Sequence, residues 1–167
     1  MIENDAEKIF LTPEQHDALA ALALSGRVGV LQAIEVARAL GARVPLSGVK
    51  LDGADLSGAD LSGADLSGAS LRYASLAGAK LDGADLRRAD LTCAWMAHAD
   101  LRRADLRRAV MVYTDLLNAD LRGADFRFAD LVAVDMTGSV YDDTTDYLDA
   151  DSLPLSAMVR QPASTGR

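Results

Sequence analysis

The 167-residue chain contains little cysteine, histidine or aromatic side chain. Its single cysteine, Cys93, excludes an internal disulfide and with it the small secreted folds that depend on several disulfides. No apolar run reaches the ~18 residues that a membrane-spanning helix needs. The first residues are acidic, whereas a secretory leader begins with positive charge. We therefore expect a soluble, cytoplasmic protein that does not bind membranes.

Few residue types supply the apolar material. The chain has 30 Ala, 25 Leu and 21 Asp, which together make 76 of its 167 residues. This composition excludes an ordinary mixed core, in which several apolar residue types contribute volume. Because half of the residues are hydrophobic, we do not expect wholesale disorder despite the net charge of −8.

A five-residue repeat organises the middle of the chain. From Leu51 to Met136 every fifth residue is large and apolar, and 14 of these 18 central residues are leucine. Alanine lies two residues before the centre in 15 quintets, and aspartate lies between the two in 12. The two residues after the centre vary along the chain. No helix or plain strand has a period of five.

The spacing within one quintet predicts an extended segment followed by a turn. Alanine and the central residue are two positions apart, so they point to one side of the segment, and the residue between them points outward. Pairs such as Ser57-Gly58 suit the turn. Repeated turns of one hand wind a solenoid with an apolar interior, which is stabilised by contacts between successive coils.

The quintets Ala54-Asp55-Leu56-Ser57-Gly58 and Ala104-Asp105-Leu106-Arg107-Arg108 resemble the pentapeptide-repeat family, whose motif is Ala-(Asp/Asn)-Leu-X-X. The resemblance covers roughly residues 44–140. It implies a mainly β solenoid, a right-handed quadrilateral β-helix of about 4.5–5 coils with four quintets per coil. Residues twenty apart would then stack, and one inward column would contain Leu56, Leu76, Met96, Leu116 and Met136.

Both ends of such a rod need a cap, because the end coils otherwise expose unpaired backbone and the leucine column. We assign residues 46–140 to the β-helix and residues 1–45 to an N-terminal helical cap. Thr12-Pro13-Glu14-Gln15 is typical of a helix start, and a second helical pattern ends near Gly41. This helical pair could also bind a partner.

Residues 141–167 are predicted to form a short C-terminal cap and a loose tail. The segment from Tyr141 to Leu148 departs from the quintet rule. The resemblance implies an alternative, because this end forms a two-fold dimer in some family members. The sequence favours capping slightly over a homodimer.

Few residues could support catalysis. His16 lies in the expected cap, while Cys93 and His98 lie at outward corners on adjacent sides, and we interpret these two as unrelated surface residues. No glycine-rich phosphate loop, zinc-ligand spacing or nucleophile elbow is present in the sequence. The sequence predicts a protein that is not an enzyme, with no metal and no cofactor.

Arginines form the most distinctive charged feature. With twenty residues per coil, eight of them fall on two adjacent faces: Arg87, Arg88, Arg102, Arg103, Arg107, Arg108, Arg122 and Arg127. Aspartates of the repeat are interleaved with them: Asp85, Asp100, Asp105, Asp120 and Asp125. One interpretation is a self-neutralising, solvated surface. The alternative is a charged stripe that recognises an acidic or polyanionic partner.

The other two faces are expected to carry apolar side chains in the last coils. Seven residues form this candidate partner surface: Trp95, Val110, Val112, Tyr113, Leu117, Phe128 and Val132, with Ala133 beside them. An exposed apolar cluster commonly marks an interface. The alternative is that the C-terminal tail folds back over it.

These features predict a non-catalytic protein-interaction module, a rigid rod that presents side chains to a protein partner. The family resemblance implies an alternative, because some pentapeptide-repeat proteins mimic duplex DNA, bind DNA gyrase or topoisomerase IV, and protect them from quinolones or toxins. A rod of about 22 Å would need about 13 negative charges to match duplex DNA. Residues 46–140 contain 14 Asp against 11 Lys and Arg, a net of −3, so a single rod is a poor charge mimic. Direct nucleic-acid binding ranks lower.

Overall fold

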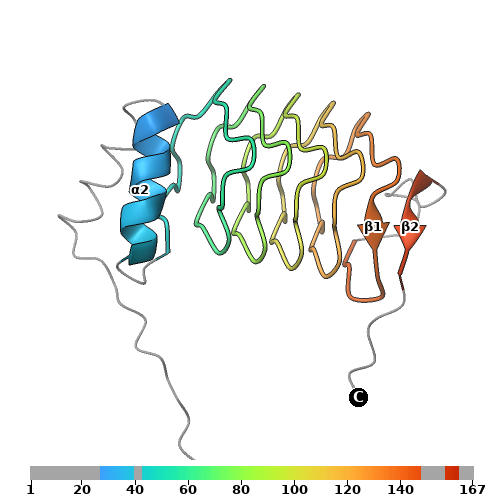
Figure 1. Ribbon diagram of the computed structural model, residues 1–167. Coiled ribbons are helices and arrows are strands. Elements are labelled where there is room, and N and C mark those ends of the chain that lie inside the picture. Colours follow the sequence, from blue (N-terminus) through green and yellow to red (C-terminus); the bar gives the residue numbers. More distant parts are fainter. Residues whose placement is uncertain (1–26, 40–42, 148–156, 162–167) are drawn as a thin grey trace, which may run out of the picture.

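Residues 27–39, 43–147 and 157–161 are described by the computed structural model of the chain. Helix α2 spans Arg27–Ala39, strand β1 spans Val140–Tyr141 and strand β2 spans Val159–Arg160. Between α2 and β1 the chain winds into a rod of successive coils that lie side by side along one axis (Figure 1).

The rod has four sides, each held by one series of parallel bridges between residues twenty positions apart. The first side runs through Lys50, Ser70, Asp90, Val110 and Asp130, and the second through Asp55, Ser75, Trp95, Asp115 and Asp135. The third runs through Asp60, Lys80, Asp100, Asp120 and Val140, and the fourth through Pro45, Asp65, Asp85, Asp105, Asp125 and Asp146. The last step, from Asp125 to Asp146, is one residue longer, so the predicted departure from the quintet rule after Tyr141 is confirmed.

Coil-to-coil pairing satisfies most of the backbone. In residues 84–88, the amides of Ala84, Asp85, Leu86 and Arg88 donate to backbone carbonyl oxygens at 3.0, 2.9, 2.8 and 3.1 Å. The amide of Ala84 closes the preceding turn, and the other three bond to neighbouring coils. Only the amide of Arg87, at the start of the next turn, lacks a backbone partner, and it donates to Asp85 Oδ1 at 3.2 Å.

This bond explains why aspartate recurs in the repeat. In all 12 quintets with aspartate before the centre, its Oδ1 accepts the backbone N–H two residues later, at 2.9–3.3 Å. Short side chains with an oxygen acceptor favour such local turns. The carboxylate therefore satisfies the one amide per quintet that the coils leave over.

The central residues fill the interior. Leu56, Leu76, Met96, Leu116 and Met136 each expose at most 1% of their surface. The alanines two positions earlier are buried in most quintets and belong to the same cluster. Their small side chains leave room for the leucines, so size alternates along each inner wall. Burying one leucine contributes about 1.5–3 kcal/mol, so the central residues of all four sides together supply most of the apolar contribution to stability.

Helix α2 covers the N-terminal end of the rod (Figure 1). Ala33, Ile34 and Ala37 are buried on one face of the helix and join the cluster of the first coil, which includes Leu46 and Leu51. Ala37 follows Ala33 by four residues and Ile34 by three, so the three side chains lie on one helical face. The predicted first helix near Thr12, and the predicted stop at Gly41, lie outside the described residues.

Strand β2 covers part of the C-terminal end. It pairs in parallel with β1, so that Val140 faces Val159 and the third side gains one more rung. Val159 N–H donates to Ser139 O at 2.7 Å, and Met158 is buried against the core. The described part of the C-terminal segment therefore returns to its own rod, and a homodimer through this end stays a prediction.

The aspartate bond can be tested at Asp115, which accepts the amide of Leu117 at 2.9 Å and has no ion pair within the described ranges. We expect Asp115→Ala to lower the free energy of unfolding by about 1 kcal/mol, because an amide loses its acceptor. Asp115→Asn keeps an acceptor oxygen and should cost much less. Urea unfolding measures both, and equal losses in the two variants would contradict the assignment.

Candidate functional site

The corners of the rod carry the unusual residues. Each corner is a β-turn closed by a hydrogen bond between residues three apart, such as Ala59 N–H to Leu56 O at 3.0 Å. The third residue of each turn has positive φ, as in a type II turn, which normally requires glycine. From residue 48 to residue 83 seven of eight such positions are glycine, whereas ten positions along the rod are not: Tyr73, Arg88, Cys93, His98, Arg103, Arg108, Tyr113, Asn118, Phe128 and Ala133.

These ten corners have an energetic cost. Their φ values lie between 55° and 63°, where an ordinary L-residue is disfavoured by about 1–2 kcal/mol. Gly58 and Gly83 have open space around the Cβ position, so the early coils could have carried side chains equally well. Gly123 is different, because an added Cβ would lie 3.3 Å from Arg103 Cγ. The later coils therefore hold large corner side chains against the preference of their backbone.

Six of the eight stripe arginines are neutralised within the rod. Five form two-pronged pairs with the aspartate two residues earlier, with Nε–Oδ1 distances of 2.7–2.9 Å: Arg87, Arg102, Arg107, Arg122 and Arg127. Arg103 pairs with Asp82 of the preceding coil, with its Nε 2.9 Å from Oδ1. On the fourth side each pair also approaches the next, as in Arg107 Nε to Asp125 Oδ2 at 3.4 Å. These contacts support the self-neutralising interpretation for these six residues.

Three of the arginine-paired carboxylates have a lowered pKa. The guanidinium of Arg87 hydrogen-bonds Asp85 and holds the pKa of that carboxyl below its ordinary value, although burial acts in the opposite direction. Arg102 lowers the pKa of Asp100 in the same way. For Asp125 burial is the largest influence and acts to raise the pKa, but the hydrogen bonds and charge of Arg127 lower it overall.

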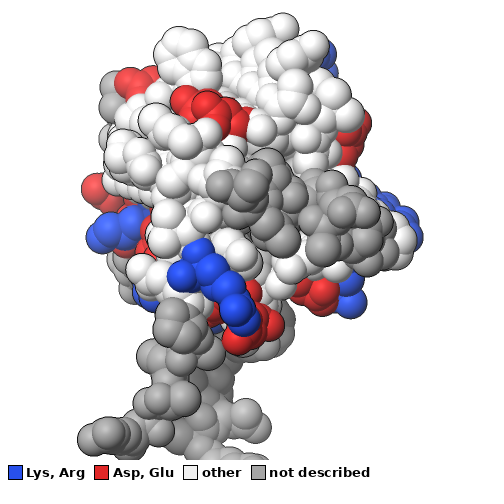
Figure 2. Space-filling view, turned by 90° about the vertical axis from the view of Figure 1, so that its right-hand side faces the viewer, with Lys and Arg blue, Asp and Glu red and all other residues white. Residues whose placement is uncertain are grey.

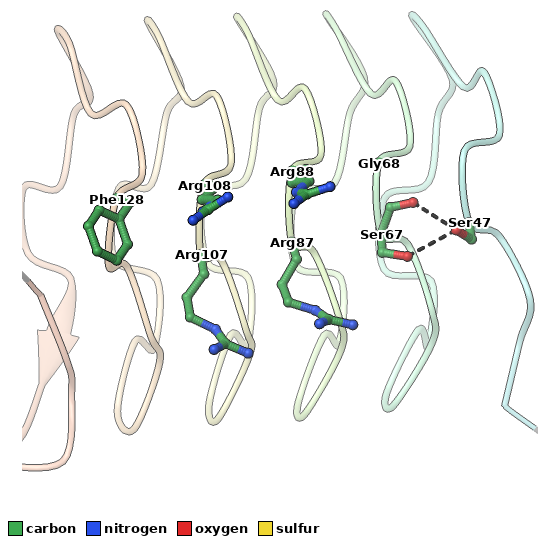
Figure 3. A pocket seen from close by; sticks show the side chains of 8 residues that line it. All are labelled: Ser47, Ser67, Gly68, Arg87, Arg88, Arg107, Arg108 and Phe128. Atoms are coloured by element: carbon green, nitrogen blue, oxygen red, sulfur yellow. Dashed lines mark hydrogen bonds between the residues drawn. The ribbon is translucent and has the colours of Figure 1, made fainter.

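Two stripe arginines differ from the rest. In the part of the chain that the structure describes, no carboxylate lies within ion-pair distance of Arg88 or Arg108. Both line a shallow groove of about 650 Å³ along the corner that ends the fourth side (Figure 3). The groove begins at Ser47 and Ser67, whose hydroxyl oxygens are 2.9 Å apart, and ends at Phe128.

Phe128 corrects the sequence analysis, which placed it on the same faces as Val110 and Tyr113. Phe128 follows Arg108 by twenty residues and therefore occupies the next rung of the same corner column. Its ring centroid lies 5.8 Å from Cζ of Arg108. That prediction is wrong, because the twenty-residue register places Phe128 in the column of Arg88 and Arg108, at the corner that ends the fourth side.

The remaining apolar candidates lie on the first and second sides. Tyr113 and Trp95 each expose 65% of their surface, Val132 exposes 59% and Val110 exposes 37%. We call these four residues the aromatic surface. Val112 and Leu117 are only partly exposed. Strand β2 pairs with the third side and leaves the aromatic surface exposed, so this described part of the tail does not cover it.

The sequence analysis missed one exposed aromatic residue. Tyr73 exposes 61% of its surface and occupies the same corner column as Tyr113, with Cys93 on the rung between them. The sequence contains the signal for this placement, because Tyr73 lies forty residues, or two coils, before Tyr113 and therefore in the same column. Seen from the C-terminal end, the rod surface is mostly uncharged, and its charged atoms form separate small groups (Figure 2).

The described residues contain no cluster of three or more metal-ligating side chains. Cys93 and His98 occupy successive corners rather than one site. In the same ranges, no helix has the length and apolar character needed to cross a bilayer.

Comparisons with known proteins agree with this architecture. The chain matches the family model for pentapeptide repeats, in eight copies, at residues 43–72, 69–108 and 99–138. A pentapeptide repeat protein of the Arabidopsis thaliana thylakoid lumen is 34% identical over 73% of this chain and 85% of its own, with a TM-score of 0.62. One from Nostoc PCC 7120 is 32% identical over 81% of this chain and 97% of its own, with a TM-score of 0.37.

A weaker likeness is to QnrB1, a plasmid-mediated fluoroquinolone resistance protein. It is 16% identical over 71% of this chain and 90% of its own, with a TM-score of 0.27. The comparison with curated proteins gives no match. The expected right-handed quadrilateral β-helix is confirmed by the repeat match together with the solved structure of the Arabidopsis thaliana protein.

Acid unfolding tests the ion pairs. Because the folded pKa of Asp85 lies below its ordinary value of about 3.9, its stabilising contribution is complete above about pH 4 and is lost as the pH falls through the lower folded pKa. Arg87→Gln should therefore reduce the loss of stability on acidification. Arg88→Gln, which removes the neighbouring guanidinium without breaking an ion pair, is the matched control. Urea unfolding between pH 2 and pH 7 compares the two, and identical profiles would refute the role of Arg87.

Backbone strain at a corner can be measured by comparing two variants of Tyr113 that both lack the ring. Tyr113→Ala and Tyr113→Gly both remove the ring, but only glycine is free of the penalty at positive φ. We expect the glycine variant to be more stable than the alanine variant by about 1 kcal/mol. Gly58→Ala should lose a similar amount, although nothing lies within 4 Å of its Cβ position. An alanine variant as stable as the glycine variant would rule out corner strain.

Proposed function

The chain belongs to the pentapeptide repeat family, and from that premise we propose that it is a non-catalytic interaction module that presents the aromatic surface to a protein partner. One observation carries the proposal: on the first and second sides Trp95 and Val110 replace the aspartate of the repeat, and Tyr113 takes a corner position that favours glycine. Strained positions that persist in a regular fold point to function, because nothing in the packing of the rod requires them.

The composition of the aromatic surface supports a protein partner. Trp95 and Tyr113 are the residue types that most often anchor interfaces, and Val110 and Val132 extend the apolar area around them. The rod holds these side chains on a hydrogen-bonded wall, so little backbone freedom is lost on binding.

Three carboxylates flank this surface. Asp115 and Asp135 share the second side with Trp95, and Asp130 follows Val110 on the first side. None of the three has an ion pair within the residues that the structure describes. The partner that fits is therefore a protein face with an apolar centre and lysine or arginine at its rim.

The same carboxylates motivate the second candidate, a duplex-DNA mimic that binds and protects a type II topoisomerase. Asp115, Asp130 and Asp135 lie on the first and second sides without an ion pair to any described residue, while most acidic groups of the third and fourth sides are paired with arginines. A supercoiling assay with purified DNA gyrase separates the two candidates. Mimicry requires that the protein inhibits gyrase or rescues it from a quinolone or toxin.

The partner surface is tested by affinity capture from the native cell with full-length protein as bait. Tyr113→Gly, alone and combined with Trp95→Ala, should reduce recovery of the specific partner at least tenfold while thermal unfolding shows an intact rod. Arg122→Gln, on the opposite third side, is the matched control and should leave recovery unchanged. A partner recovered equally by all four proteins would refute this surface.

A further inference from the structure

The groove at the end of the fourth side has an unbalanced charge. Arg87 and Arg107 occupy the first turn position and fold back onto Asp85 and Asp105, with Nη2–Oδ2 distances of 2.6 Å in both pairs. Arg88 and Arg108 follow them directly in sequence but stand at the positive-φ position. Within the described ranges, they are the two stripe arginines without a carboxylate partner.

The β-helix places Arg88 and Arg108 on neighbouring coils of one corner column. Arg88 N–H donates to Arg107 O at 3.1 Å, so Arg88 and Arg108 lie on adjacent rungs, about 4.8 Å apart along the rod. Guanidinium groups on adjacent rungs repel each other when no negative charge neutralises them. The nearby carboxylates of Asp85 and Asp105 are already engaged by Arg87 and Arg107, so they cannot provide that neutralisation.

The two ends of the groove differ in chemistry. On one side of the arginines, the Ser67 hydroxyl donates to Asp65 Oδ1 at 2.6 Å and lies 2.9 Å from the Ser47 hydroxyl oxygen, so it is engaged within the rod. On the other side, the ring of Phe128 exposes 61% of its surface and contacts the guanidinium of Arg108. Figure 3 shows this order along the rod, from the serines through the two arginines to the aromatic ring.

We infer that this groove binds a phosphate monoester whose organic group rests against Phe128. A phosphate monoester carries a charge of about −1.5 to −2 and three acceptor oxygens, so one such group can accept hydrogen bonds from both Arg88 and Arg108. A single carboxylate has one charge and leaves one guanidinium unmatched. The planar, fixed fork of arginine suits phosphate geometry better than a lysine ammonium would. The site is separate from the aromatic surface and does not depend on the proposed protein partner.

Titration of the full-length protein tests the inference, with phenyl phosphate, inorganic phosphate and benzoate as probes. Two-dimensional amide NMR reports where each probe binds. We expect phenyl phosphate to shift the amides of residues 67–68, 87–88, 107–108 and 128. It should bind about tenfold more tightly than benzoate, because its phosphate group can accept charge-assisted hydrogen bonds from both guanidinium groups.

Glycine variants remove the side chains without risk to the fold, because Gly48 and Gly68 occupy the same corner column. The Arg88→Gly/Arg108→Gly double variant should bind phenyl phosphate at least tenfold more weakly. Phe128→Gly should abolish the preference for phenyl phosphate over inorganic phosphate while inorganic phosphate still binds. Arg122→Gln, whose guanidinium is paired with Asp120, is the control and should change neither affinity.

Each outcome of these titrations either supports the phosphate site or overturns it. Localised shifts that disappear in the double variant support the site. Absence of binding to the wild-type protein, or equal binding by the double variant, overturns it. Benzoate binding as tight as that of phenyl phosphate would show that the groove selects carboxylates and would refute the phosphate assignment.

Discussion

In 12 of the 18 quintets, one hydrogen bond between an aspartate carboxylate and the amide two residues later completes the hydrogen bonding of the corner. Coil-to-coil pairing and the turn itself engage four amides per quintet, and this bond engages the fifth. The same carboxylate then positions an arginine when one follows at the first turn position, as in the Asp85–Arg87 pair. The repeat therefore specifies two things: apolar residues for the core, and an aspartate acceptor for the backbone amide that has no other partner. The ion pairs along the third and fourth sides use the same aspartates.

The places where the motif fails are informative for that reason. Trp95 and Val110 stand where aspartate normally accepts the amide, so these quintets lack the carboxylate and present an apolar side chain instead. Tyr113 stands where glycine is favoured. These exceptions lie together on the first and second sides of the rod. Local rules broken at neighbouring sites of an otherwise regular fold are the pattern expected of a binding surface.

Much of the fold was predictable from the sequence, because a period of five with apolar centres has few physical solutions. With four quintets in each coil, residues twenty apart stack, and this register alone predicts that Arg87 aligns with Arg107. The aspartate–amide bond was not predictable, since it depends on the local path of the chain into the turn. Nor could the sequence distinguish Arg87 from Arg88, which are adjacent and chemically identical. Only the turn separates them, because it directs one side chain back to Asp85 and leaves the other without a carboxylate partner among the residues that the structure describes.

The free-energy cost of the non-glycine corners is large compared with the stability of a whole domain. A non-glycine residue at positive φ costs about 1–2 kcal/mol, and a whole domain is stable by only about 5–15 kcal/mol. Several such corners therefore use a substantial share of the stability that the apolar column provides. Because each coil contacts only its neighbours, a corner can change its side chain without altering the rest of the rod. The architecture thus lets the aromatic surface and the arginine groove differ in chemistry on separate sides, while the same column of leucines supports both.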